Sequence, residues 1–529
     1  MSDFKNLEHL LMEGRISRRE FISRMSAMGL AAALSPALLP KRAEAAVPKK
    51  GGHFIIGLTG GSTTNSLDPA TLSAAIDTTL NLTIRNALVE IDHNFNLIPE
   101  LAESWDSSPD ASVWKFNLRK GVEFHNGKTF TADDVIFTMN HHRDEASKSP
   151  IKALLKAVKE IKKDGDYAVI FTLDSGSADF PFVIAAIRLT MCQDGTKGPE
   201  FEKGIGTGGY MLEAWEPGVR ALLKRNPNYW KEGRAHFDSA EMLAISDGNA
   251  RTIALKTGRI HYMDRVDLKS VHFLKKMPNI NINALTGLSH IAIPMLLDRS
   301  PYNDNDVRMA LKLAIDREAL VKTILQGYGE VGNDHPIAPI NRYHADNLEQ
   351  RHYDPDKARY YIKKARMLDH VFNLHSADAV SMGAIDIAVM MKEHAKKAGI
   401  KINVIQEPND GYWSNVWMKK EWCFCYWSGR PTEDLMFTVA YQTGAPWNDT
   451  HWSNKRFDEL LIGARSELDT DKRRKMYAEM QEIVRNDSGT IVPLFYQNVE
   501  ASSTKVTHGP IAANTGLDGL RIVERWWFV

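Results

Sequence analysis

The chain has few cysteines, no excess charge of either sign, and no apolar run long enough to span a membrane. Three cysteines in 529 residues exclude a disulfide framework and a four-cysteine zinc site. The 66 Lys and Arg residues balance the 66 Asp and Glu residues, so no net field attracts a nucleic acid or an acidic membrane surface. Local groups must therefore bind any ligand. The length of this globular chain predicts two or three domains.

Residues 1–45 contain the elements of an export signal in the usual order. Arg18 and Arg19 precede an apolar stretch over residues 25–39, and residues 43–45 read Ala-Glu-Ala, an A-x-A cleavage site. The apolar stretch is shorter than the roughly 20 residues that span a bilayer. We expect a twin-arginine signal peptide, cleaved at its end, and a soluble periplasmic chain without an anchor. A surface amphipathic helix that happens to carry Arg-Arg is the alternative.

Helix and strand signals alternate along the remaining chain, which favours a mixed α/β fold. An Asn-Gly pair at 126–127 predicts a tight hairpin turn, and Thr131 with Asp134 predicts a capping box at the start of a helix. Apolar residues at helical spacing predict one helix over residues 306–325. A helix over residues 384–398 is followed directly by a strand, as in a parallel sheet.

Motifs for catalysis and nucleotide binding lack the context that they require. Residues 204–209 match GxGxxG, but they precede a strand-like segment, so no helix N-terminus would face a pyrophosphate. The sequence contains no HExxH, CxxC or GxSxG motif. We expect no catalytic residues, no cofactor and no metal site. An exported enzyme that acts on a small polar substrate is the alternative function.

Aromatic residues gather in one segment of the second half. Six of the twelve tryptophans fall within the 40 residues 413–452. Large rings stack on ligands and provide apolar contact area, so this density is typical of a pocket lining. A core wall is the alternative, because Cys423, Cys425 and Trp427 share one side of an apparent strand over residues 421–427. The candidate ligand-contacting rings are Tyr412, Trp413, Trp417, Trp427 and Trp447.

A turn with charges of both signs follows the apparent strand. Arg430 could hold a carboxylate or phosphate through two parallel hydrogen bonds. Alternatively, it forms an internal ion pair with Glu433 or Asp434. All three residues are candidates for ligand binding.

Several separated segments occur in the order typical of one known family. They are LAESW (101–105), LRKGVEFHNGKTFTADDVIFT (118–138), GTGGYML (206–212), RNPNYW (225–230), SPYNDNDVRMALKLAIDREALV (300–321) and YDPDKAR (353–359). With these segments the whole mature chain resembles the family 5 extracellular solute-binding proteins of ABC importers, which include oligopeptide, dipeptide and nickel binders.

The resemblance implies an α/β fold of two lobes that close on a ligand, with an extra subdomain inserted in the first lobe. We expect lobe I with this subdomain over residues 46–288, lobe II over residues 289–498, and a return to lobe I over residues 499–529. Residues 427–429 resemble the Trp-x-Gly of peptide binders, in which an Asp follows and pairs with the α-amine of the ligand. Arg430 takes that place here, and a cation does not pair with an ammonium, so Glu433 or Asp434 would have to bind the α-amine of a peptide. The alternatives to an ordinary peptide are an anionic or sugar-like solute and an amino-acid conjugate.

The resemblance also implies the partners. The protein would capture a small or peptide-like solute and deliver it to an ABC permease in the membrane, which works with its ATPase. The signal implies the twin-arginine export machinery as a further partner. We expect a monomer that does not bind nucleic acid.

Overall fold

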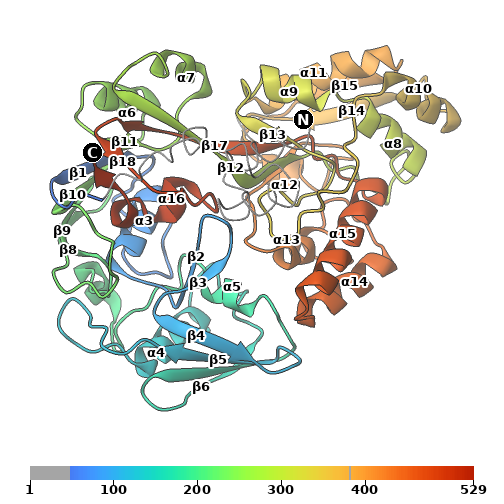
Figure 1. Cartoon of the computed structure of the whole chain (residues 1–529). Coiled ribbons are helices and arrows are strands. Elements are labelled where there is room, and N and C mark those ends of the chain that lie inside the picture. The colour runs from blue at the N-terminus through green and yellow to red at the C-terminus, as the bar shows by residue number, and fades with distance from the viewer. Residues whose placement is uncertain (1–47, 381–382) are drawn as a thin grey trace, which may run out of the picture. The chain divides into compact units, whose positions relative to one another are not determined.

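A computed structural model of the chain describes residues 48–380 and 383–529. The predicted signal peptide over residues 1–45 lies outside these residues. The described part is mixed α/β, and helices connect the strands of its sheets (Figure 1). Lys50–Val529 forms one compact unit.

The largest sheet has nine strands in the order β16-β12-β17-β11-β1-β10-β9-β8, and β13 pairs with β17 (Figure 1). Its longest pairing is between the antiparallel strands β12 and β17, which cross the boundaries predicted at residues 288 and 498. The strands of this sheet are β1 (His53–Leu58), β8 (Tyr210–Glu216), β9 (Arg220–Arg225), β10 (Ser239–Ala244), β11 (Tyr262–Met263), β12 (Ile280–Ala292), β13 (Gly329–Val331), β16 (Cys425–Trp427) and β17 (Leu494–Ser503).

A separate antiparallel sheet lies within predicted lobe I and has its own hydrophobic core. The turn predicted at residues 126–127 is present, because Phe124 N donates to Lys128 O at 2.8 Å. The predicted capping box of Thr131 and Asp134 opens α4. The elements here are β4 (Ala102–Ser107), β5 (Val113–Leu118), α4 (Ala132–Arg143), β6 (Val158–Lys163), β7 (Ala168–Leu173) and α5 (Phe180–Ile184).

Predicted lobe II contains the parallel pair β14 (Val371–Ser376) and β15 (Lys401–Gln406), joined by α11 (Ala384–Lys397) as predicted. The single helix predicted over residues 306–325 is wrong. Two helices, α8 (Asn305–Leu313) and α9 (Arg317–Thr323), occupy this segment. The reason is Asp316, whose carboxylate accepts a hydrogen bond from Ala319 N at 2.9 Å and caps a new helix.

The strand predicted over residues 421–427 is shorter in the structure, where only β16 is regular and isolated bridges occur at Trp422 and Cys423. The remaining helices are α3 (Ala75–Ile84), α6 (Gly248–Lys256), α7 (Leu268–Leu274), α10 (Pro355–Lys364), α12 (Tyr412–Asn415), α13 (Glu433–Ala440), α14 (Lys455–Ser466), α15 (Thr470–Asp487), α16 (Gly516–Leu520) and α17 (Ile522–Arg525). The short pairs are β2 (Val89–Ile91) with β3 (Leu97–Pro99) and β18 (Val506–Thr507) with β19 (Trp527–Phe528).

Candidate functional site

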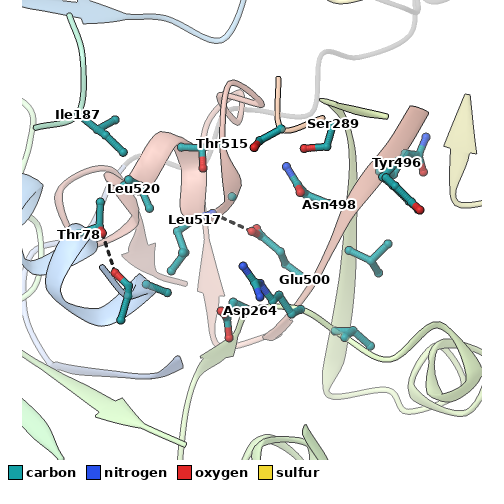
Figure 2. A pocket seen from close by; sticks show the side chains of 18 of the residues that line it. Thr78, Ile187, Asp264, Ser289, Tyr496, Asn498, Glu500, Thr515, Leu517 and Leu520 are labelled. Carbon is teal, nitrogen blue, oxygen red and sulfur yellow. Dashed lines mark hydrogen bonds between the residues drawn. The ribbon is translucent and has the colours of Figure 1, made fainter. Parts of the chain in front are cut away.

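A pocket of about 660 Å³ lies beside the paired strands β12 and β17 (Figure 2). Its lining comes from the start of α3, from residues 187–188, from residues 264–268, from β17 and from α16, and it includes Ser289 and Ser428. The segments predicted as lobe I, lobe II and the C-terminal return all contribute. The volume lies within the range of about 300–1,000 Å³ that is usual for small-molecule sites.

Glu500 is a buried carboxyl in the wall of this pocket. Its Oε1 accepts a hydrogen bond from Leu517 N at 2.7 Å, drawn as a dashed line in Figure 2. A Cβ atom on Gly516 would lie 2.6 Å from the same oxygen, so glycine permits this close approach. Burial raises the pKa of Glu500 to about 7. The carboxyl is therefore partly protonated at neutral pH.

The backbone beside Glu500 has an unusual conformation. Residues 517–520, three of which are not glycine, all have positive φ angles, between 55° and 65°. Such residues store strain of about 1–3 kcal/mol each, so surrounding contacts must hold them. Asp518 provides some of these contacts, because its Oδ1 accepts from Ala512 N and Arg525 Nη1, each at 2.8 Å. The wall of the pocket is thus a left-handed turn fixed by buried hydrogen bonds.

A second acidic residue of the lining, Asp264, is already occupied by protein groups. Its Oδ1 accepts from Thr59 N and Thr59 Oγ1, both at 2.9 Å, and lies 3.5 Å from Arg251 Nε. Burial raises the pKa of Asp264 in spite of these contacts.

The predicted aromatic cluster is present, and Trp427 lies at its centre. The Trp427 ring contacts those of Trp417 and Trp447 at 6.3 and 6.1 Å between centroids. Trp427 is only 5% exposed, and its Nε1 donates to Asp449 Oδ2 at 3.2 Å. Trp417 Nε1 donates to the same oxygen at 3.4 Å, and burial raises the pKa of Asp449 to about 6. Asp449, which the sequence analysis did not single out, therefore orients two of the candidate rings.

The other candidate rings divide between core and surface. Tyr412 is buried and its hydroxyl donates to Phe424 O at 2.9 Å, so it packs in the core of predicted lobe II. Trp413 and Trp447 are 40% and 49% exposed. Trp413 also contacts the exposed ring of Tyr426 at 5.5 Å. The exposed edge of the cluster consists of these three rings.

The alternative that Arg430 forms an internal ion pair with Glu433 or Asp434 is wrong. Thr432 caps α13, which places both acids in its first helical turn, inside the protein. Glu433 accepts from Tyr343 N at 2.6 Å, and Asp434 pairs with Arg465 at 3.1 Å. Burial raises the pKa of Glu433 to about 7 and that of Asp434 to about 6.

Arg430 itself is half-buried beside the aromatic cluster. Its Nη1 donates to Ser428 O at 2.8 Å, and its guanidinium lies 5.9 Å above the centre of the Trp427 ring. In the part of the chain that the structure describes, it forms no ion pair, and burial lowers its pKa. Of residues 427–430, Ser428 lines the pocket described above. Arg430 is therefore hydrogen-bonded to a residue that lines the pocket, and no carboxylate of the described residues pairs with its charge.

A buried ion pair joins predicted lobe I to predicted lobe II. Asp179, next to α5, pairs with Arg473 of α15 at 2.8 Å, and both side chains are less than 10% exposed. Nearby, Ala178 N donates to Arg465 O at 2.7 Å.

No sequence motif pointed to Glu500 or to the turn that holds it. Glu500 was recognisable only as the one charged residue in the ten-residue strand β17. Its partner Leu517 gave no signal, because nothing local shows that residues 500 and 517 share a pocket.

The profile of the bacterial extracellular solute-binding proteins, family 5 (Middle), matches residues 96–449. Di/tripeptide-binding protein 1 of Pseudomonas aeruginosa is 26% identical over 512 residues, covering 90% of this chain and 95% of that protein. The glutathione-binding protein GsiB of Pectobacterium atrosepticum is 25% identical over 462 residues, covering 84% of this chain and 90% of that protein.

A solved structure shares the fold. It is the ABC transporter-associated periplasmic binding protein DppA of Helicobacter pylori in complex with the peptide STSA, with a TM-score of 0.71 and 23% identity. The match covers 91% of this chain and 98% of that chain.

The architecture is therefore that of the two-lobe periplasmic binding proteins. The chain belongs to the bacterial extracellular solute-binding proteins of family 5. Its relatives are binding proteins, and the alternative of an exported enzyme has no support among them. Across residues 48–380 and 383–529, no helix combines the length and the apolar character needed to cross a membrane.

Proposed function

We propose that this protein captures a peptide or peptide-like solute in the pocket beside β12 and β17 and delivers it to an ABC permease driven by an ATPase. The observation that carries the proposal is the lining, to which residues of 46–288, 289–498 and 499–529 all contribute. A ligand bound there touches every predicted segment, so it favours a closed arrangement of the two predicted lobes. The relatives named for di/tripeptides and glutathione support the peptide class.

Closure also involves protein contacts in this proposal. The buried pair of Asp179 and Arg473 would separate when the predicted lobes open, and exposure of both groups to water compensates for the lost contact. Binding of the solute then supplies the free-energy difference that favours the closed form over the open form. The solute is released without chemical change.

The ligand carries a carboxylate or phosphate near Arg430 in this proposal. The half-buried guanidinium has no carboxylate partner among the described residues, and it stands where peptide binders have an acid. The exposed rings of Trp413 and Trp447 contribute contact area beside it, and the inner rings of Trp417 and Trp427 support them. Glu433, Asp434 and Tyr412 act by supporting the local structure.

The export route belongs to the same proposal. Arg18 and Arg19 direct the precursor to the twin-arginine machinery, cleavage follows Ala45, and the monomeric product works in the periplasm. Residues 1–45 lie outside the described residues, so the sequence alone supports this part.

The test is calorimetry of the purified protein with small peptides, accompanied by mass spectrometry of the recovered peptide. Saturable 1:1 binding with recovery of unchanged peptide supports the proposal. Release of a peptide of altered mass supports the enzyme alternative instead. Heat effects that do not saturate with any peptide contradict peptide capture.

A further inference from the structure

Two arginines of the pocket lining, Arg188 and Arg265, are the basis of a further inference. We propose that they bind negatively charged groups of the ligand, so that the pocket selects a peptide-type solute with a side-chain carboxylate in addition to its terminal one. This inference rests on the proposed function, since it concerns the same pocket. It differs from the proposal for Arg430, which does not itself line this pocket.

Arg188 is a partly buried guanidinium with unused hydrogen-bonding capacity. Its Nη2 donates to Leu72 O at 2.9 Å, but its buried Nε has no hydrogen-bond partner among the described residues. Asp77 is the carboxylate whose charge acts on it, and Asp77 accepts from Ser73 N and Ala74 N at 3.1 and 2.9 Å. Burial lowers the pKa of Arg188, as expected for a cation without an ion-pair partner.

Arg265 reaches the pocket from a strained backbone position. Its φ angle is 47°, in the left-handed region that non-glycine residues rarely adopt. The neighbouring residues hold it there: Asp264 accepts from Thr59, and Val266 N donates to Val499 O at 2.8 Å. Strain of this kind persists at ligand sites, where it positions a side chain. The side chain of Arg265 is exposed and, within residues 48–380 and 383–529, forms no ion pair.

The acidic residues of the lining do not neutralise these two arginines by contact. Asp264 pairs with Arg251, and the charge of Arg265 offsets only part of the rise in the pKa of Asp264 that burial causes. Glu500 accepts from Leu517 N, and burial raises its pKa to about 7, so it carries only part of a charge at neutral pH. The pocket therefore offers more unpaired positive than negative charge to a ligand. Guanidinium groups prefer carboxylates, which they bind through parallel hydrogen bonds.

The test compares two probe peptides of nearly equal size, Ala-Glu-Ala and Ala-Gln-Ala, by titration calorimetry with the exported protein. We expect Ala-Glu-Ala to bind at least about tenfold more tightly, and this ratio to fall as salt is added. Arg265→Ala and Arg188→Met should each lower the ratio severalfold. Arg265→Glu should reverse the preference in favour of Ala-Lys-Ala.

Arg220→Ala is the matched control. Arg220 lies on β9 outside the pocket lining and pairs with Glu216 at 2.8 Å, so the ratio should not change. Arg265 is exposed, so its replacement should leave the protein folded. The Arg265 variants can therefore be compared with the unmodified protein even when Arg188→Met does not fold.

The outcomes separate this inference from the proposed function. Equal affinity for the two peptides, or a ratio that Arg265→Ala and Arg265→Glu leave unchanged, overturns the inference while peptide capture stands. No binding of either peptide contradicts peptide capture itself, and the inference falls with it.

Discussion

Replacement of the buried carboxyl at position 500 should change the pH dependence of stability in a defined direction. The perturbation is Glu500→Gln, which keeps an oxygen that can accept from Leu517 N and removes the ionisable group. Glu500 has a pKa of about 7 in the folded protein and its usual 4.5 when exposed. The folded state therefore keeps a proton that the unfolded state loses between these pH values.

The size of the stability change follows from the difference between the folded and unfolded pKa values of Glu500. Below pH 4.5 the group is protonated in both states and contributes nothing. As the pH rises to about 7, the free energy of unfolding falls by an amount on the order of 3 kcal/mol, and the loss is constant above that pH. Glu500→Gln abolishes this loss. For a chain of this length, about 1 to 2 °C in Tm accompanies each kcal/mol, so the variant should melt about 3 to 6 °C higher at pH 8.

The assay is differential scanning calorimetry of the wild type and the variant at pH 4 and pH 8 without ligand. The two proteins should melt alike at pH 4. Other acids with raised pKa, such as Glu433, Asp434 and Asp449, are present in both proteins and cancel in the comparison. Glu482→Gln, at an exposed position, is the control and should show no difference at either pH. A Glu500→Gln protein that melts lower than the wild type at pH 8 would refute the reasoning.

Three further predictions follow from the site and the export signal. Trp427→Ala should lower the free energy of unfolding by about 3 to 5 kcal/mol in urea, because it removes a buried ring and a hydrogen bond to Asp449; a loss below about 1 kcal/mol would contradict this packing. Arg430→Ala should weaken ligand binding by about 2 to 5 kcal/mol in calorimetry, and a loss below about 0.5 kcal/mol would show that Arg430 does not bind an anionic group of the ligand. Replacement of Arg18 and Arg19 by lysine should retain the precursor in the cytoplasm on immunoblots of cell fractions, whereas normal periplasmic appearance would exclude the twin-arginine route.

Local signals predicted local structure well. The capping box of Thr131 and Asp134 and the turn at residues 126–127 depend on neighbouring residues alone, and both are present. The helix predicted over residues 306–325 was divided because a single capping residue, Asp316, outweighed a continuous apolar pattern. The order of the separated family-like segments was enough to predict the two-lobe α/β fold by resemblance.

The pocket could be predicted much less well, because it depends on contacts between distant residues. Pairing of β12 with β17 brings Glu500 to the cavity, and no pattern near residue 500 shows this. The sequence did locate an aromatic cluster, but it could not show that Asp449 holds Trp417 and Trp427 on the inside. Glu433 and Asp434 looked available to Arg430 because they are close in sequence, yet the helix that they begin turns them toward other partners.

The central claim is that the protein captures a peptide-type solute and releases it unchanged. Native mass spectrometry of the protein as isolated from the periplasm tests this claim most directly, with the released ligand then identified by its mass and fragmentation. The account predicts a 1:1 complex with a peptide-like compound that carries at least one carboxylate, and the same mass for that compound after rebinding and prolonged incubation with the protein. A co-purifying ligand without an anionic group, or one that incubation with the protein converts to a product of different mass, would contradict the account.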